Sequence, residues 1–140
     1  MLSIQISDIK DFMSHLLSKD TFDHFYFIEA SIKMGVSYQI QGRINEGFYD
    51  TSVEQTLNRE FCYWKEIRHR IFDIIKGKRL PLSCKIVLGL SKQSISYLIA
   101  HNNSSFREED IEGIYINILY DPKNLLITTG ISYKNFSLDK

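Results

Sequence analysis

The sequence has little of what secreted and membrane-spanning proteins depend on. It contains two cysteines and two prolines, and no run approaches the roughly 20 apolar residues of a membrane-spanning helix. Residues 1–9 lack the cationic stretch followed by an apolar stretch that marks a secretory signal. Cys62 and Cys84 form no C-x-x-C pair and no dense disulfide pattern, which argues against zinc binding and for reduced thiols. We therefore predict a soluble, cytoplasmic protein without a membrane partner.

Net charge and catalytic signatures are also missing. The 17 Lys and Arg residues balance the 17 Asp and Glu residues, and this zero net charge argues against nucleic-acid binding by the chain as a whole. The sequence has no G-x-x-x-x-G-K-[ST] phosphate loop, no G-x-G-x-x-G dinucleotide motif and no H-E-x-x-H zinc motif. We predict no cofactor and no bound metal, and favour a protein that is not an enzyme.

The chain does contain the material for a core. Its 140 residues include 44% hydrophobic and 13% aromatic residues, which a disordered chain would not have. This length is typical of one domain that buries roughly 70% of its unfolded surface. We predict a single domain over residues 1–140.

The first part of the chain alternates between strand and helix patterns. Apolar residues recur at every second position from Leu2, and after Asp8, a helix-capping residue, they recur at three-and-four spacing. Two strand-like runs then surround Met34 and Gly35, as in a hairpin. Residues 2–44 are thus predicted to form a β-α-β-β unit.

The second part repeats this order. A strand, a helix over 91–100 and two strands around a turn at 121–124 make residues 84–136 a second β-α-β-β unit. Residues 57–77 between the units are predicted to form one long helix. The predicted fold class is α+β: two pseudo-duplicated units joined by a long central helix, with a mainly antiparallel sheet.

Two charges interrupt the apolar stripe of the predicted central helix. With 100° per residue, the apolar residues between Leu57 and Ile75 gather around Trp64, and Glu60 and Arg68 fall on either side of the centre of that stripe. A buried charge is costly unless it is paired. Our preferred interpretation is that both side chains pair with charges from other elements, and a ligand site is the alternative.

The predicted central helix and the residues after it form a positively charged segment. Residues 58–85 contain eight Lys or Arg residues and three acidic residues, a local excess of five positive charges. These cations favour either a solvated surface or a nucleic-acid site with an aromatic side chain for base stacking. The candidate binding residues are Tyr63, Arg68, Lys76, Lys78, Arg79 and Lys85.

A polar cluster lies between the first helix and the hairpin. Asp20, Asp23 and His24 place two carboxylates and an imidazole within five residues, a set that can bind a metal or act on a small polar substrate. The spacing is unspecific, and a turn stabilised by Asp23 is the preferred interpretation. No catalytic residue is assigned.

Short motifs along nearly the whole chain resemble a family of uncharacterised bacterial (Firmicutes-type) proteins, a domain of unknown function. They are Thr21 to Phe25, Glu29 to Ile32, Gly42, Asn45, Phe48-Tyr49, Trp64, Ile75 to Arg79, Pro81, Lys85 to Val87 and Thr128 to Gly130. This resemblance implies a bacterial cytoplasm but no activity. The order of elements also resembles the half-domains of DNA sliding clamps, which implies a nucleic-acid-associated protein that oligomerises.

These observations lead to three functional hypotheses. The first is a non-catalytic binding or interaction module of unknown ligand, whose partner is another protein or a second copy of the chain. The second is a clamp-like, nucleic-acid-associated accessory protein. The third is a small-molecule enzyme that uses Asp23 and His24.

Overall fold

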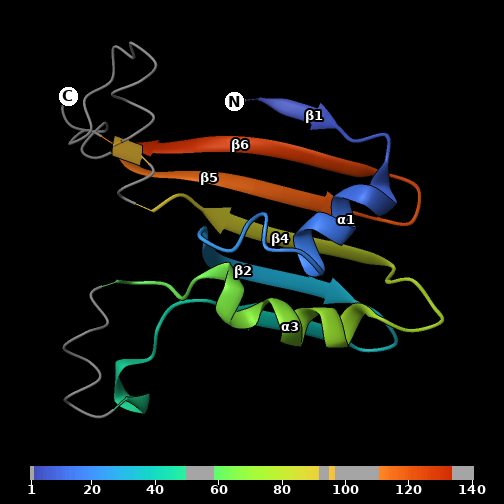
Figure 1. Cartoon of the computed structure of the whole chain (residues 1–140), viewed down its shortest axis with the longest axis horizontal. Helices are drawn as coiled ribbons and strands as arrows, with labels where there is room; N and C mark the ends of the chain where they lie inside the picture. The colour runs from blue at the N-terminus through green and yellow to red at the C-terminus, as the bar shows by residue number, and fades with distance from the viewer. Residues whose placement is uncertain (1, 50–58, 92–94, 97–110, 134–140) are drawn as a thin grey trace.

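A computed structural model describes residues 2–49, 59–91, 95–96 and 111–133. Within them, a six-stranded antiparallel sheet has the order β1-β6-β5-β4-β2-β3 (Figure 1). Its strands are β1 (Ser3–Gln5), β2 (Tyr26–Lys33), β3 (Ser37–Gln41), β4 (Ser83–Gly89), β5 (Ile111–Tyr120) and β6 (Leu125–Tyr133). The helices are α1 (Ile9–Leu17), α3 (Trp64–Ile75) and the short 3₁₀ helix η1 (Glu46–Phe48). The α+β class and the mainly antiparallel sheet are confirmed.

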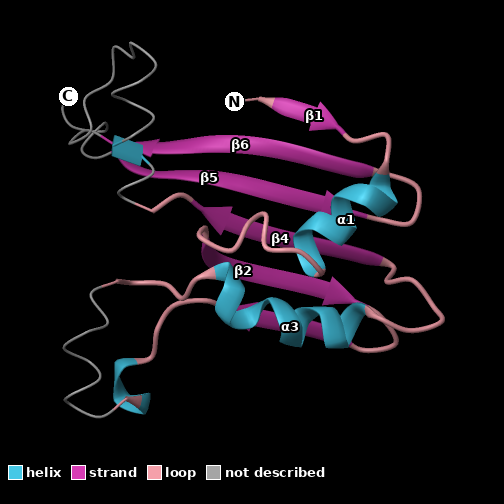
Figure 2. Cartoon of the chain, in the orientation of Figure 1, coloured by secondary structure: helices cyan, strands magenta, loops and turns pink. Residues whose placement is uncertain are grey.

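Both α-helices cover the same face of the sheet (Figure 2). Strand β2 shows why, because Phe27, Ala30 and Ile32 are buried whereas Glu29 and Ser31 are only half-buried. Alternating side chains of a strand lie on opposite faces, and a bulge at residue 28 keeps Phe27 on the same face as Ala30. The hydrophobic core therefore lies between one face of the sheet and the two helices.

Helix α1 begins where the sequence predicts. The carboxylate of Asp8 accepts the backbone N–H of Asp11 at 3.0 Å, an N-cap that satisfies one of the free amides of the first turn. Leu16 and Leu17 at the other end of the helix are buried. The predicted hairpin around Met34 and the predicted turn at 121–124 are also present.

The predicted duplication is wrong. The two halves do not form separate units, because the strands of both halves interleave in one sheet. Strand β1 pairs with β6, and β2 pairs with β4 as well as with β3. The repeated order of elements along the chain carries no information about which strands pair. Most of the helix predicted over 91–100 lies outside the described residues.

The predicted long central helix is also wrong. Helix α3 begins at Trp64, and described residues before it, Phe61 and Tyr63, form β-bridges with Arg43 and Tyr26. Backbone hydrogen bonds explain the late start: Phe27 N–H donates to the carbonyl of Cys62 at 2.8 Å, and Cys62 N–H donates to Gly42 at 2.9 Å. These tertiary bonds outweigh the weak helix propensity of a stretch rich in aromatic residues.

Candidate interaction surface on the face without helices

We call the sheet face opposite α1 and α3 the helix-free face. It carries two continuous rows of side chains. No helix of the described part of the chain covers it (Figure 1). In strand register the first row runs Gln39, Ser31, Lys85, Leu119, Leu126 and Gln5. The second row runs Gln41, Glu29, Val87, Asn117, Thr128 and Ser3. Each row crosses all six strands, so the face is one surface.

A hollow of about 450 Å³ opens at one end of this face. Its lining includes the apolar side chains of Leu119 and Leu126 and the charged side chains of Lys33 and Lys85. Lys85 is exposed, and no acidic side chain among the described residues lies within ion-pair distance of either lysine. Asp121 also borders the hollow, but one of its carboxylate oxygens accepts two backbone N–H groups, each at 2.8 Å. The hollow thus combines apolar contact area with two unpaired cations.

The other end of the helix-free face is aromatic. A third row of strand register joins Tyr26, Gly89, Tyr115 and Gly130. The ring of Tyr26 stacks on Tyr63 with 5.4 Å between centroids and lies 6.4 Å from Phe61. Burial raises the pKa of both Tyr26 and Tyr115, and neighbouring carboxylates add to the increase for Tyr115. Both phenols therefore stay neutral at neutral pH.

Two arginines flank this aromatic group. The guanidinium of Arg59 lies 4.4 Å above the ring of Tyr63, and that of Arg43 lies 5.2 Å above Phe61. Both are also ion-paired: Arg43 with Glu60, and Arg59 with Glu66 through two hydrogen bonds of 2.6 and 3.1 Å. The hydrogen bonds from Arg59 lower the pKa of Glu66. The charges of this arginine cluster are therefore already neutralised.

The close fit of this region depends on one glycine. A Cβ atom at Gly42 would lie 1.8 Å from the carbonyl oxygen of Phe27, so any other residue forces the backbone apart. The resulting close approach brings residues 42–44 beside the segment before α3, and a second hollow of about 420 Å³ forms next to Arg43 and Arg59. Gly42 thus positions the arginine cluster.

The two charges predicted within the helical stripe are both paired. Arg68, with 9% of its surface exposed, donates from Nε and Nη2 to the two carboxylate oxygens of Asp23 at 2.9 and 3.1 Å. Glu60 pairs with Arg43, outside helix α3. The preferred interpretation, pairing with other elements, matches this geometry.

The residues of the predicted polar cluster do not converge on one point. Asp23 is engaged by Arg68, whereas Asp20 and His24 are exposed. Within the described residues, no group of three His, Cys, Asp or Glu side chains can hold a metal ion. The arrangement is that of a turn tied to helix α3 through Arg68.

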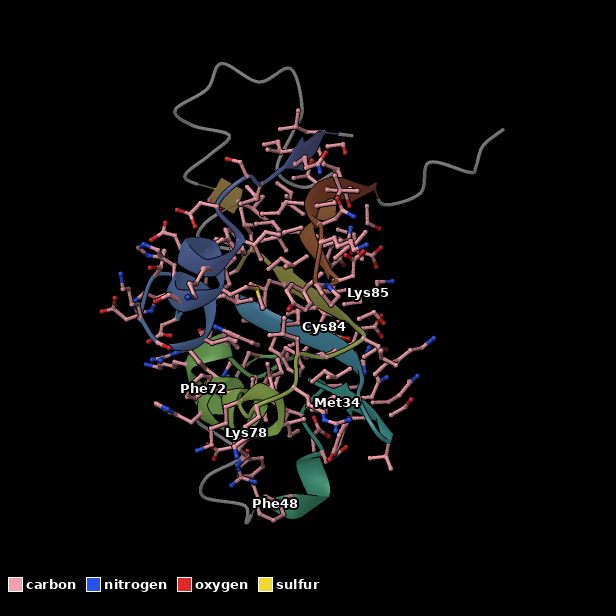
Figure 3. The ribbon with its side chains drawn as sticks, turned by 90° about the vertical axis from the view of Figure 1, so that its right-hand side faces the viewer. Met34, Phe48, Phe72, Lys78, Cys84 and Lys85 are labelled. Atoms are coloured by element: carbon pink, nitrogen blue, oxygen red, sulfur yellow. The ribbon has the colours of Figure 1, made fainter. Side chains whose placement is uncertain are left out.

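The structure separates the predicted basic residues. Lys85 lies on the helix-free face, whereas Lys78 lies at the end of α3 on the opposite side (Figure 3). Lys76 forms an ion pair with Asp73 at 3.1 Å, and Arg79 is exposed in the loop that follows α3. Among the candidate binding residues, Lys85 and Tyr63 therefore share a side of the sheet, and the cations after α3 do not join them.

Lys33 and Arg43 are not among the candidate residues predicted from the sequence. Lys33 alternates with Ser31 and Glu29 along the second strand, and this polar alternation is the signal that identifies the helix-free face. Arg43 has no such signal, because its partners Glu60 and Phe61 lie far away in the chain.

Comparisons with known proteins identify a family and no function. A family model described as a family of unknown function, DUF5721, matches residues 15–140. No curated protein and no solved structure matches the chain, so the predicted clamp resemblance finds no support. None of the described helices is long and apolar enough to cross a membrane.

Proposed function

We propose that this chain, which belongs to the DUF5721 family of unknown function, is a non-catalytic module that binds an acidic segment of a partner protein through its helix-free face. The carrying observation is the hollow on that face, which is lined by Leu119, Leu126 and two lysines, Lys33 and Lys85, that have no ion-pair partner among the described residues. Apolar contact supplies affinity, and the two lysines select for negative charge.

Nucleic acid is the second candidate ligand. The stack of Tyr26 and Tyr63 lies on the same side of the sheet as Lys85, and stacked aromatic side chains beside cations bind single strands. Against it, Arg43 and Arg59 already bind carboxylates, so a phosphate would have to displace them. An acidic protein segment therefore fits the charges better.

The enzyme hypothesis has less support. Both carboxylate oxygens of Asp23 accept hydrogen bonds from Arg68, which leaves Asp23 poorly placed to act as a base. We also propose a single domain in a reducing, cytoplasmic compartment, since Cys62 and Cys84 are unpaired.

Charge reversal on the two sides of the sheet tests the proposed function. The experiment compares four proteins by the amount of partner protein that each captures from extracts of the source organism. They are wild type, Lys85→Glu and Leu126→Asp on the helix-free face, and Lys78→Glu on the opposite side. Lys78 and Lys85 are both exposed lysines, so Lys78→Glu controls for the change in net charge. We expect a partner protein that wild type and Lys78→Glu retain and that both face variants lose. The proposal is contradicted if Lys78→Glu loses the partner as fully as the two face variants do. It is also contradicted if neither face variant changes the capture.

Oligonucleotides separate the second candidate from the first. Short fluorescent single strands are titrated with the same four proteins at two salt concentrations. Affinity that falls at least tenfold between about 50 and 200 mM salt, and further in Lys85→Glu, would favour nucleic acid over protein.

A further inference from the structure

Strand β3 forms an open edge of the sheet. Gly42 donates its N–H to Ile28, which lies opposite it in the continued register of β2 and β3. Because antiparallel strands alternate the direction of their backbone groups, Tyr38 and Ile40 also hydrogen-bond with β2. The N–H and C=O groups of Ser37, Gln39 and Gln41 therefore point away from the sheet.

This edge lacks the features that usually prevent strands from pairing. Proteins protect edges with charged residues, proline, bulges or very short strands. The five residues of β3 contain neither charge nor proline, their register with β2 is uninterrupted, and four of the five are exposed. The opposite edge strand, β1, has only three residues. Strand β3 is thus the edge that is able to accept another strand.

We infer that two copies of this chain pair through β3, antiparallel and about a two-fold axis at Gln39, to form one continuous sheet of both subunits. In this register Gln39 lies opposite Gln39 of the second copy, and Ser37 lies opposite Gln41. The outward backbone groups then form about six hydrogen bonds, two for each of three residue pairs.

The side chains of β3 suit a second copy. On the face covered by α3, Tyr38 of each copy lies opposite Ile40 of the other, and aromatic residues opposite β-branched residues stabilise antiparallel pairs. Tyr38 is 37% exposed in the single chain and gains this contact on pairing. No like charges meet, because the strand has none. This interface uses an edge of the sheet and is independent of the proposed binding function.

Charge variants at the two-fold axis test this register. Gln39→Lys places two positive charges opposite each other, and Gln39→Glu places two negative charges there. Gln39 is exposed and its N–H points away from the sheet, so both variants are expected to fold. We expect sedimentation equilibrium to show a wild-type dimer of twice the 16.4 kDa chain, and each variant alone to be a monomer. An equimolar mixture of the two variants restores the dimer, because opposite charges then meet at position 39.

A proline variant provides the second line of the test. Gln39→Pro removes two hydrogen bonds of the interface and none of the subunit, and weakens the dimer by about 30-fold. Ser3→Pro at the other edge is the matched control, because the N–H of Ser3 also points away from the sheet, and it leaves the dimer intact. Circular dichroism verifies the fold of each variant. A wild-type monomer at several hundred micromolar, a dimer whose affinity Gln39→Pro leaves unchanged, or a charge mixture that stays monomeric overturns the inference.

Discussion

Replacing Arg68 with methionine is expected to destabilise the protein by about 3–5 kcal/mol. The guanidinium binds both carboxylate oxygens of Asp23, and the two side chains are only 11% and 13% exposed. Methionine preserves the aliphatic contacts of the arginine stem but leaves the carboxylate buried without its cation. The unpaired charge therefore causes most of the expected loss, and a packing defect contributes little.

The chain contains its own control for this magnitude. Arg43 pairs with Glu60, but these side chains are 62% and 57% exposed, and exposed ion pairs contribute only about 0–1 kcal/mol. With a urea m-value of about 2 kcal/mol/M, Arg68→Met shifts the unfolding midpoint by about 1.5–2.5 M. Arg43→Met should shift it by less than about 0.5 M.

Equilibrium unfolding in urea measures both shifts. The single tryptophan, Trp64, is fully buried and donates its indole N–H to the carbonyl of Leu16 at 2.8 Å, so its fluorescence reports the contact between the helices. The double variant Arg68→Met/Asp23→Leu removes both charges and should recover most of the lost stability. Equal shifts for Arg68→Met and Arg43→Met, or no recovery in the double variant, would refute the reasoning.

Three further predictions concern the backbone, the pH dependence and the thiols. Gly42→Ala should lower the urea midpoint strongly, because its Cβ would lie 1.8 Å from the carbonyl oxygen of Phe27, whereas Gly35→Ala, with no atom within 4 Å, should change it little. The pKa of Glu66 in the folded state lies below its ordinary value of 4.5, so its ion pair with Arg59 stabilises the protein above pH 4.5 and loses that contribution as the pH falls further. In Glu66→Gln, the urea midpoint should therefore fall less on acidification than in wild type. Burial raises the pKa of Cys84 to about 12, so iodoacetamide at pH 8 should alkylate Cys84 only after urea has unfolded the protein. Mass spectrometry measures the alkylation, and rapid labelling of Cys84 in the folded protein would contradict this prediction.

The sequence predicted those features that local patterns determine. The cap at Asp8, the hairpin around Met34 and the α+β class all depend on residues a few positions apart. The same holds for the apolar side of α3, which buries Trp64 and Ile71. Such patterns fix elements, but they do not determine which strands of a sheet become neighbours.

The sequence-based predictions were wrong where contacts between residues far apart in the chain determine the local structure. Phe61 has the spacing of a helical stripe, yet Gly42 and Ile44 make backbone hydrogen bonds with the residues on either side of it and keep it extended. The separation of Lys78 from Lys85 has a similar cause, since the loop after α3 crosses from the helical layer to the sheet between them (Figure 3). A cluster of cations in sequence becomes a surface patch only if the intervening chain keeps them on one side.

The contact between the helices links the core to the candidate surface. Trp64 and Arg68 of α3 donate to the last carbonyls of α1, at Leu16 and Leu17, and hold both helices over the same face of the sheet. The other face thus lacks a described helix, and it carries residues that a packed core would reject, such as Lys85 and Glu29. A sheet with one apolar and one polar face is stable in water, because antiparallel strands tolerate solvent on one side. The polar residues of the helix-free face are therefore compatible with the fold, so the face can carry the proposed binding site without loss of stability.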